Sequence, residues 1–185
     1  MLDYQIDTLN KSGVKNISIV SGFKYKLYKF HNTKIFINKD WKKTSNLQSL
    51  WEAKDELKNT IISFGDIIFS EKAIQALNFN NNEGKDICIL CDKSWVNHTS
   101  YRKHYIAVKC NISKNRNLLT GNFPTVIRLE DNLDKETSDG EFIGMLKLSE
   151  KGSAIFKKHL QILKKSNQLK KMSLHNFINY LIKNI

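Results

Sequence analysis

Three groups of polar residues directly follow stretches of the sequence that are predicted to form β-strands. They are Ser21 to Lys24, Asn38 to Asn46, and the pair Gly65–Asp66. In open α/β sheets, ligands bind beyond the carboxyl ends of the strands. These three groups are therefore the first candidates for residues that carry chemistry.

Asp66 is the candidate metal ligand. It follows the apolar run 61–65 (IISFG), in which Gly65 permits close approach of the backbone to a ligand. A carboxylate at this position suits Mg²⁺, because this ion takes one or two protein oxygens and completes its shell with phosphate and water. The alternative is an aspartate in an ordinary turn or at the approach to a helix.

Hydrophobic periodicity indicates which elements position these groups. Apolar stripes at helical spacing predict a helix over 2–12 and helices that begin at Asn46, Ser70, Ser149 and Ser173. Strands are predicted at 16–21, 33–38, 60–64 and 86–91, and then at 104–112, 120–128 and 141–148.

The order of these elements predicts the α/β class. Strands that alternate with helices imply right-handed parallel crossovers, so the first four strands should share one sheet. The last three strands have no helices between them, which indicates an antiparallel insertion or edge. We therefore expect a three-layer sandwich with a mainly parallel, mixed central sheet.

Composition limits the possible partners. The 185 residues suffice for one compact domain, and 30 Lys+Arg against 18 Asp+Glu give a net charge of +12, which favours anionic partners. Many of the lysines form short runs without interleaved aromatic residues, as on solvated helix faces, so a nucleic-acid-binding domain is the less favoured alternative.

With neither a signal peptide nor an apolar run of roughly 18 residues, we expect a cytoplasmic protein that does not span a membrane. Cys88 and Cys91 should point to opposite faces of one strand, without a metal between them.

Five motifs in sequence order resemble those of the nucleotidyltransferase family with a GT-A type fold. They are SGFKYK (21–26), NKDWKKTSNLQSLWEAKDEL (38–57), FGDIIF (64–69), CDKSW (91–95) and DGEFIGMLKLSEKG (139–152). Within that family the motifs are most similar to those of cytidylyltransferases for phosphocholine and for small phosphonates. One such match would be weak, but five in order are specific.

The resemblance implies roles for individual residues. Asp66 would hold the Mg²⁺ that bridges the nucleotide phosphates, and Lys24 and Lys93 would supply positive charge. Thr44, Asn46 and Ser49 would line the substrate site, although Ser45 stands where the family more often has asparagine. Glu141 would face a cationic head group. The alternatives are solvated surface lysines for Lys24 and Lys93 and an edge-strand charge for Glu141.

The implied activity is the transfer of CMP from CTP to a small phosphorylated or phosphonate acceptor, such as phosphocholine or 2-aminoethylphosphonate, with release of pyrophosphate. The family pattern also includes a glycine-rich phosphate-binding loop before the first motif and a metal-binding aspartate after the last. Neither occurs within 1–185, so we expect a single nucleotidyltransferase-like domain cut at both ends. The alternative is a catalytically inactive remnant that acts as a binding module.

Overall fold

The computed structural model describes residues 1–27, 33–81, 84–97, 104–111, 124–131 and 134–185. Five helices and seven strands are considered below. The helices are α1 (Leu2–Lys11), α2 (Asn46–Glu52), α3 (Glu71–Asn81), α4 (Glu150–Lys165) and α5 (Leu174–Asn184). The strands are β1 (Ile17–Ser21), β2 (Thr33–Ile37), β3 (Ile61–Ser63), β4 (Ile87–Asp92), β5 (Ile106–Asn111), β6 (Thr125–Asp131) and β7 (Gly140–Leu148).

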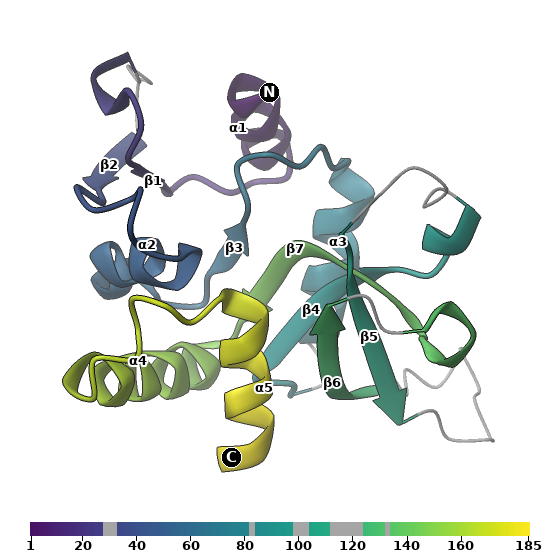
Figure 1. The fold of residues 1–185 in the computed structure, drawn as a ribbon. Coiled ribbons are helices and arrows are strands. Elements are labelled where there is room, and N and C mark those ends of the chain that lie inside the picture. Colours follow the sequence, from purple (N-terminus) through teal and green to yellow (C-terminus); the bar gives the residue numbers. More distant parts are fainter. Residues whose placement is uncertain (28–32, 82–83, 98–103, 112–123, 132–133) are drawn as a thin grey trace.

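Strand β7 is the centre of the larger sheet (Figure 1). It pairs antiparallel with β3, β4 and β5, and β5 pairs with β6 at the margin. Seven of its nine residues are buried, as expected for a strand covered on both faces. Strand β7 is antiparallel to its neighbours, as the sequence analysis expected, but it lies between β3 and β4 at the centre of the sheet and not at an edge.

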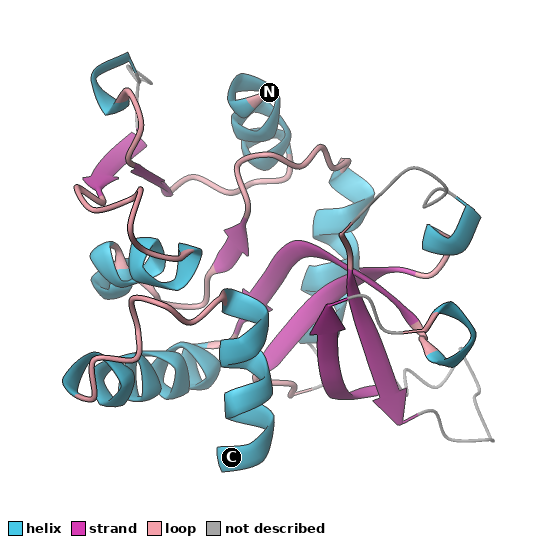
Figure 2. Cartoon of the chain, in the orientation of Figure 1, coloured by secondary structure: helices cyan, strands magenta, loops and turns pink. Residues whose placement is uncertain are grey.

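Helices cover both faces of this sheet (Figure 2). One apolar cluster contains Phe142 and Leu146 of β7 together with residues of α4 and α5, whereas Met145 of β7 packs with residues of α3. Gly144, at φ +84°, interrupts the strict alternation between the two faces, and the register with β4 shifts at the same level. The α/β class and the layering of helices on both faces agree with the sequence prediction.

The expectation of one sheet for the first four strands is not met. β1 and β2 form a separate parallel pair, whereas β3 and β4 belong to the β7 sheet. β3 and β4 nevertheless run in the same direction, because each is antiparallel to β7. The predicted parallel crossover through α3 is thus correct in direction, although a later strand separates its two members.

Two serine caps were predicted correctly and one cap was not. The side chain of Ser149 accepts a hydrogen bond from the amide of Gly152, and that of Ser173 accepts one from Asn176. Helix α2 is instead preceded by Ser45, and the side-chain oxygen of Asn46 accepts a hydrogen bond from the amide of Leu174 at 2.9 Å. Asn46 therefore ties α2 to the start of α5.

Cys88 and Cys91 lie on opposite faces of β4, as predicted. Cys88 packs in the cluster under α3, and Cys91 packs against the cluster that contains α4 and α5. Burial, with a smaller contribution from nearby Cys110, raises the pKa of Cys91 to about 12. The Cys91 thiol is therefore a neutral core side chain at physiological pH.

A side chain of α5 binds the outer edge of β6 at Leu129. Asn179 accepts a hydrogen bond from the amide of Leu129 at 2.8 Å and donates one to the carbonyl of the same residue at 2.6 Å. This side chain thereby satisfies the two backbone groups that a further strand would use at that position. Within the described ranges, no helix has the length and apolar character needed to cross a lipid bilayer.

Candidate functional site

Asn38, directly after β2, is the centre of a hydrogen-bonded polar cluster. Its side chain is almost fully buried, and its amide nitrogen donates to the hydroxyls of Thr44 at 2.9 Å and Ser49 at 3.0 Å. Its side-chain oxygen accepts from the amide of Asp40 at 3.1 Å. Two of the predicted substrate-binding residues, Thr44 and Ser49, are therefore held together by one buried amide.

The backbone fixes Asn38 at the carboxyl ends of the parallel pair. Its amide donates to the carbonyl of Ser21 at 2.9 Å, which continues the β1–β2 ladder by one residue. A Cβ atom on Gly22 would lie 2.4 Å from the Trp41 side chain, so only glycine fits the turn against this loop. The turn after β1 and the loop after β2 are therefore packed together, as expected for strand ends that share a ligand edge.

Lys24 lies in this turn with a left-handed backbone conformation, at φ +49°. Its ammonium group is 5.2 Å from the ring centre of Phe23, and Phe23 packs edge-on against Trp41 at 5.4 Å. Lys42 is placed similarly over Trp41, at 5.5 Å. The turn that carries Lys24 is thus packed against the loop that carries Thr44.

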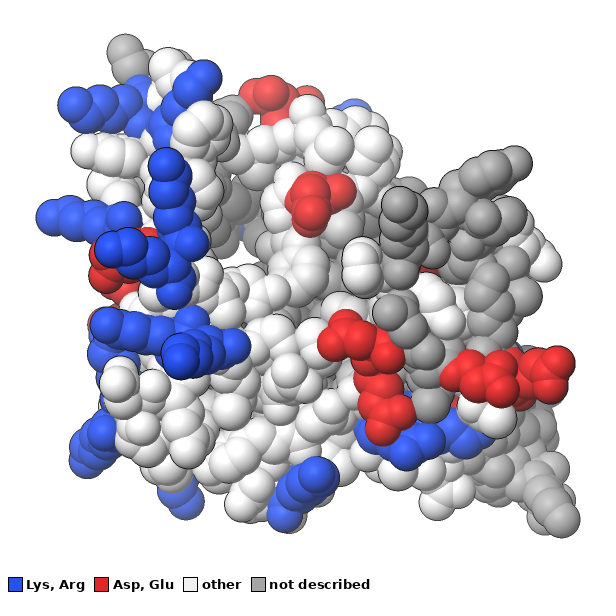
Figure 3. Space-filling model, viewed as in Figure 1, with Lys and Arg blue, Asp and Glu red and all other residues white. Residues whose placement is uncertain are grey.

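Exposed lysines surround this cluster. Figure 3 shows that basic side chains gather on the side of the molecule that carries β1, β2 and α2. They are Lys24, Lys26, Lys34, Lys39, Lys42 and Lys43. Except for Lys34, which pairs with Glu56 at 3.0 Å, they form no ion pair with another described residue. A phosphorylated ligand is therefore attracted to this side of the molecule.

Asp66 lies on the exposed turn that follows β3. Within the described part of the chain, its carboxylate forms no hydrogen bond or ion pair. No three potential metal-ligating side chains gather among the described residues, so Asp66 would share a metal ion with at most one further side chain of these types among them. This arrangement fits Mg²⁺, which commonly uses one or two carboxylates together with phosphate oxygens and water.

Glu141 and Lys93 lie at the β4–β7 end of the larger sheet. Glu141 is buried on β7, paired in register with Asp92 of β4 and Ala107 of β5. Lys93 is exposed in the turn after β4. The described contacts join Thr44, Ser49 and the turn of Lys24, whereas a shared cleft with Asp66, Glu141 and Lys93 stays a prediction.

The sequence analysis included Asn38 in a polar run but did not identify its function. A recognisable signal was present, because an asparagine that ends a strand often accepts a hydrogen bond from the amide two residues later, as Asn38 does from Asp40. Asn46 was named as a substrate-binding residue, but its side-chain oxygen is used to hold α5.

Comparisons with known proteins find a partial sequence similarity to one cytidylyltransferase. No protein-family model matches the chain. CTP:phosphoglutamine cytidylyltransferase from Campylobacter jejuni is 31% identical over 114 residues, which cover 55% of this chain. The matched part is 44% of that relative, so this chain is aligned with less than half of its length.

Two solved structures share the fold. CTP:phosphocholine cytidylyltransferase from Streptococcus pneumoniae superposes with a TM-score of 0.66 at 14% identity, covering 99% of this chain and 72% of the other. A putative glucose-1-phosphate thymidylyltransferase from Bacillus anthracis superposes with a TM-score of 0.67 at 16% identity, covering 99% and 70%. The structural matches confirm the predicted GT-A-like fold. Together with the sequence match, they support the nucleotidyltransferase family that the five motifs indicated.

Proposed function

We propose that the protein takes part in transferring CMP from CTP to a small phosphorylated acceptor, with release of pyrophosphate. The observation that carries this proposal is the 31% identity with a cytidylyltransferase. The likeness to a second CTP-using enzyme and the cationic, hydroxyl-rich strand ends add support. Residues 1–185 would contribute the parts of the site that follow β1, β2, β3 and β4.

The proposed reaction is a displacement at the α-phosphorus of CTP. An oxygen of the acceptor's phosphoryl or phosphonate group forms a bond to this phosphorus. The bond between the phosphorus and the oxygen that bridges to the β-phosphate breaks, and its electron pair leaves with pyrophosphate. The protein's task is mainly to position the two substrates and to neutralise charge that develops on the phosphate oxygens.

The residues near the strand ends suit that task. Asn38 fixes the positions of the Thr44 and Ser49 hydroxyls, and Lys24 lies in the turn after β1 that packs against their loop. Asp66 would hold Mg²⁺, which neutralises charge on the triphosphate when it is bound. Lys93 would supply a second cation from the turn after β4.

The acceptor is proposed only as a chemical class. Phosphocholine and 2-aminoethylphosphonate both combine an anionic phosphorus group with a cationic nitrogen, for which the carboxylate of Glu141 would be a partner. The Campylobacter jejuni relative is named for phosphoglutamine instead. These three compounds therefore form the acceptor panel for a test.

Pyrophosphate release tests the proposal. The chain is incubated with Mg²⁺, with each of CTP, UTP, dTTP, ATP and GTP in turn, and with each acceptor of the panel. We expect release with CTP and one acceptor, and loss of release when the metal is chelated. Saturable binding of CTP without turnover would instead support a non-catalytic binding module, and the absence of both binding and turnover would overturn the proposal.

A further inference from the structure

The residue that precedes α2 binds the segment that connects α4 to α5, residues 166–173, which we call the α4–α5 connection. The amide of Ser45 donates to the carbonyl of Lys170 at 2.9 Å. The hydroxyl of Ser45 donates to the carbonyl of Met172 and lies 3.4 Å from that of Leu169. Leu169 is fully buried, so the connection is itself anchored in the apolar core.

This use of Ser45 differs from that of two other serines that precede helices. Ser149 and Ser173 each accept a hydrogen bond from an amide in the first turn of their own helix, as serines at this position commonly do. Ser45 has the same extended backbone conformation, at φ −83° and ψ 174°, but its side chain forms no such bond with α2. Its hydroxyl is directed instead to carbonyls 124 to 127 residues later in the chain.

Ser45 lies between the two hydroxyls of the polar cluster. It directly follows Thr44, and its carbonyl accepts a hydrogen bond from the amide of Ser49 at 3.4 Å. The side chains of Thr44 and Ser49 are bound by the buried amide of Asn38. The positions of both hydroxyls therefore depend on two anchors, which are Asn38 within the loop and Ser45 at the contact with the α4–α5 connection.

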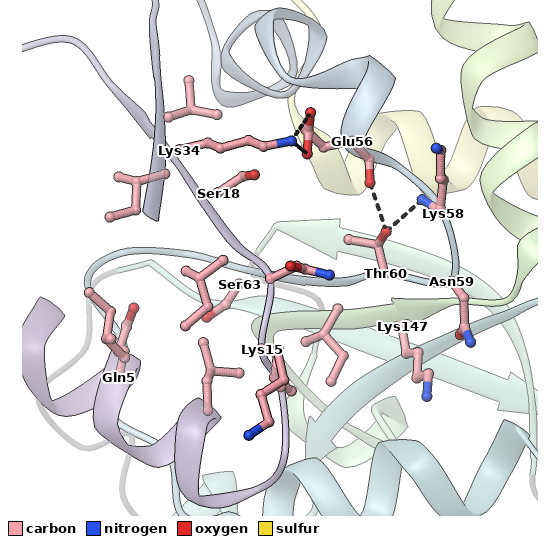
Figure 4. Close-up of a pocket in the computed structure, with 18 of the residues that line it drawn as sticks. Gln5, Lys15, Ser18, Lys34, Glu56, Lys58, Asn59, Thr60, Ser63 and Lys147 are labelled. Carbon is pink, nitrogen blue, oxygen red and sulfur yellow. Dashed lines mark hydrogen bonds and ion pairs between the residues drawn. The ribbon is translucent and has the colours of Figure 1, made fainter. Parts of the chain in front are cut away.

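The attachment at the other end of α2 is weaker. Lys34 of β2 pairs with Glu56, shortly after α2, at 3.0 Å on the wall of a cavity of about 700 Å³ beside β1 (Figure 4). The Lys34 side chain is 68% exposed, and exposed ion pairs contribute little because water and salt screen their attraction. Residues 38–52 do not line this cavity. The loop that carries Thr44 is therefore held mainly through Ser45 and Asn38.

We propose that Ser45 is a positioning residue for the nucleotide, because its bonds to the α4–α5 connection hold Thr44 and Ser49 in the geometry that binds CTP. This inference rests on the proposed function, in which those two hydroxyls contact the substrate. Ser45 acts through its neighbours, since the single proton of its own hydroxyl is donated to the connection. A segment remote in sequence thereby supports the substrate site.

Steady-state kinetics of two variants test this role. Ser45→Ala removes the hydroxyl, whereas Ser45→Thr keeps it in an extended backbone conformation that threonine readily adopts. We expect Ser45→Ala to raise the KM for CTP about fivefold to tenfold and to change kcat by less than about twofold. Ser45→Thr should restore the KM to within about twofold of the unchanged protein. Where CTP binds without turnover, its dissociation constant replaces the KM.

Amide hydrogen exchange without nucleotide separates positioning from general destabilisation. In Ser45→Ala the amides of residue 45 and of Ser49 should exchange at least about threefold faster than in the unchanged protein. The amide of Leu148 in β7, which donates to Thr60 at 2.9 Å, reports on the larger sheet and should change less.

Two further variants serve as controls. Ser166→Ala removes a hydroxyl that donates to the carbonyl of Leu163 at 3.2 Å, within the same connection but without a bond to α2. Glu56→Gln breaks the ion pair with Lys34 at the other end of α2. Exchange at residue 45 and at Ser49 should stay unchanged in both variants, and Ser166→Ala should also keep the KM for CTP.

Three outcomes would overturn the inference. They are an unchanged affinity for CTP in Ser45→Ala, equal acceleration of exchange at Ser49 and Leu148, and failure of Ser45→Thr to restore the affinity. The unchanged protein tests the proposed function separately, because absence of both CTP binding and turnover there would refute that function. The nucleotide-free exchange data would still show whether Ser45 holds the loop.

Discussion

The β7 sheet buries mainly apolar side chains, whereas the β1–β2 pair and the residue that follows it bury polar ones. β7 buries seven of nine residues between two apolar clusters. In β1 and β2 the one buried residue is Ser21, and the buried residue just beyond β2 is Asn38. Apolar burial contributes most of the stability of a domain, whereas buried polar groups fix geometry. The larger sheet thus provides the stable framework, and the parallel pair provides precisely positioned polar groups at its strand ends.

Removal of a buried aromatic ring from the core beside the larger sheet should have the largest effect on the free energy of unfolding. Phe156 of α4 is fully buried and packs edge-on against Phe177 at 5.0 Å. Phe156→Ala should lower the free energy of unfolding by about 3–5 kcal/mol. The matched change Phe23→Ala, at a ring that is 57% exposed, should cost less than about 1 kcal/mol. Urea denaturation measures the free energy of unfolding of both variants. Equal losses of stability would contradict the conclusion that the larger sheet region provides the stable framework.

Replacement of Asp66 should affect turnover without affecting stability. Asp66→Asn keeps the shape of the side chain but removes the negative charge that would hold Mg²⁺. Turnover should fall by roughly two orders of magnitude or more, equivalent to about 3 kcal/mol, while the free energy of unfolding stays within about 0.5 kcal/mol. Asp7→Asn makes the same charge change on the exposed surface of α1 and should leave pyrophosphate release unchanged. Normal turnover in Asp66→Asn would remove Asp66 from the mechanism.

Loss of Asn38 should affect both stability and substrate binding. Asn38→Ala removes the buried donor to Thr44 and Ser49 and leaves the backbone amide of Asp40 without its acceptor. The free energy of unfolding should fall by about 1–3 kcal/mol, and the KM for CTP should rise. Asn10→Ala, at an exposed position of α1, is the control. An unchanged KM would show that the two hydroxyls do not contact the nucleotide.

The smallest effect should be a pH dependence from His159. This buried side chain lies 3.3 Å from the hydroxyl of Tyr180, and burial, aided by Lys158, lowers its pKa below the ordinary value of 6.5. The unfolded chain therefore binds the proton more readily, and stability should decline as the pH falls below 6.5. Urea midpoints at pH 7.5 and 5.5 should differ less in His159→Gln than in the unchanged protein. Equal differences would exclude His159 as the source.

Local features of the fold could be predicted from the sequence because they depend on neighbouring residues. The stripe at 2–12 gave α1, and Ser149 and Ser173 cap their helices as expected. The position of β7 could not be predicted in the same way, since its insertion between β3 and β4 depends on pairing between residues about fifty to eighty-six positions apart. Its long apolar run, FIGML at 142–146, was a signal of a strand buried on both faces.

The candidate site was predictable to a similar extent. The loop after β2 and the turn after β1 were identified as ligand positions because strand ends attract polar residues, and the structure packs them together. The burial of Asn38 depends on Thr44 and Ser49 folding back over it, which no residue pattern specifies. The contribution of Asp66, Glu141 and Lys93 to the same site stays a prediction that requires a bound nucleotide for its test.

The two hydrogen bonds between Asn179 and Leu129 have a consequence for behaviour at high concentration. A sheet grows into aggregates by recruiting chains onto its free outermost strand. The described part of the larger sheet has several such margins, and at one of them, β6, the amide and carbonyl of Leu129 are already bound by an intramolecular side chain. An incoming chain must first displace Asn179 and detach it from α5, which is a local unfolding step. The resistance of this margin to strand addition at Leu129 is therefore linked to how firmly α5 stays docked.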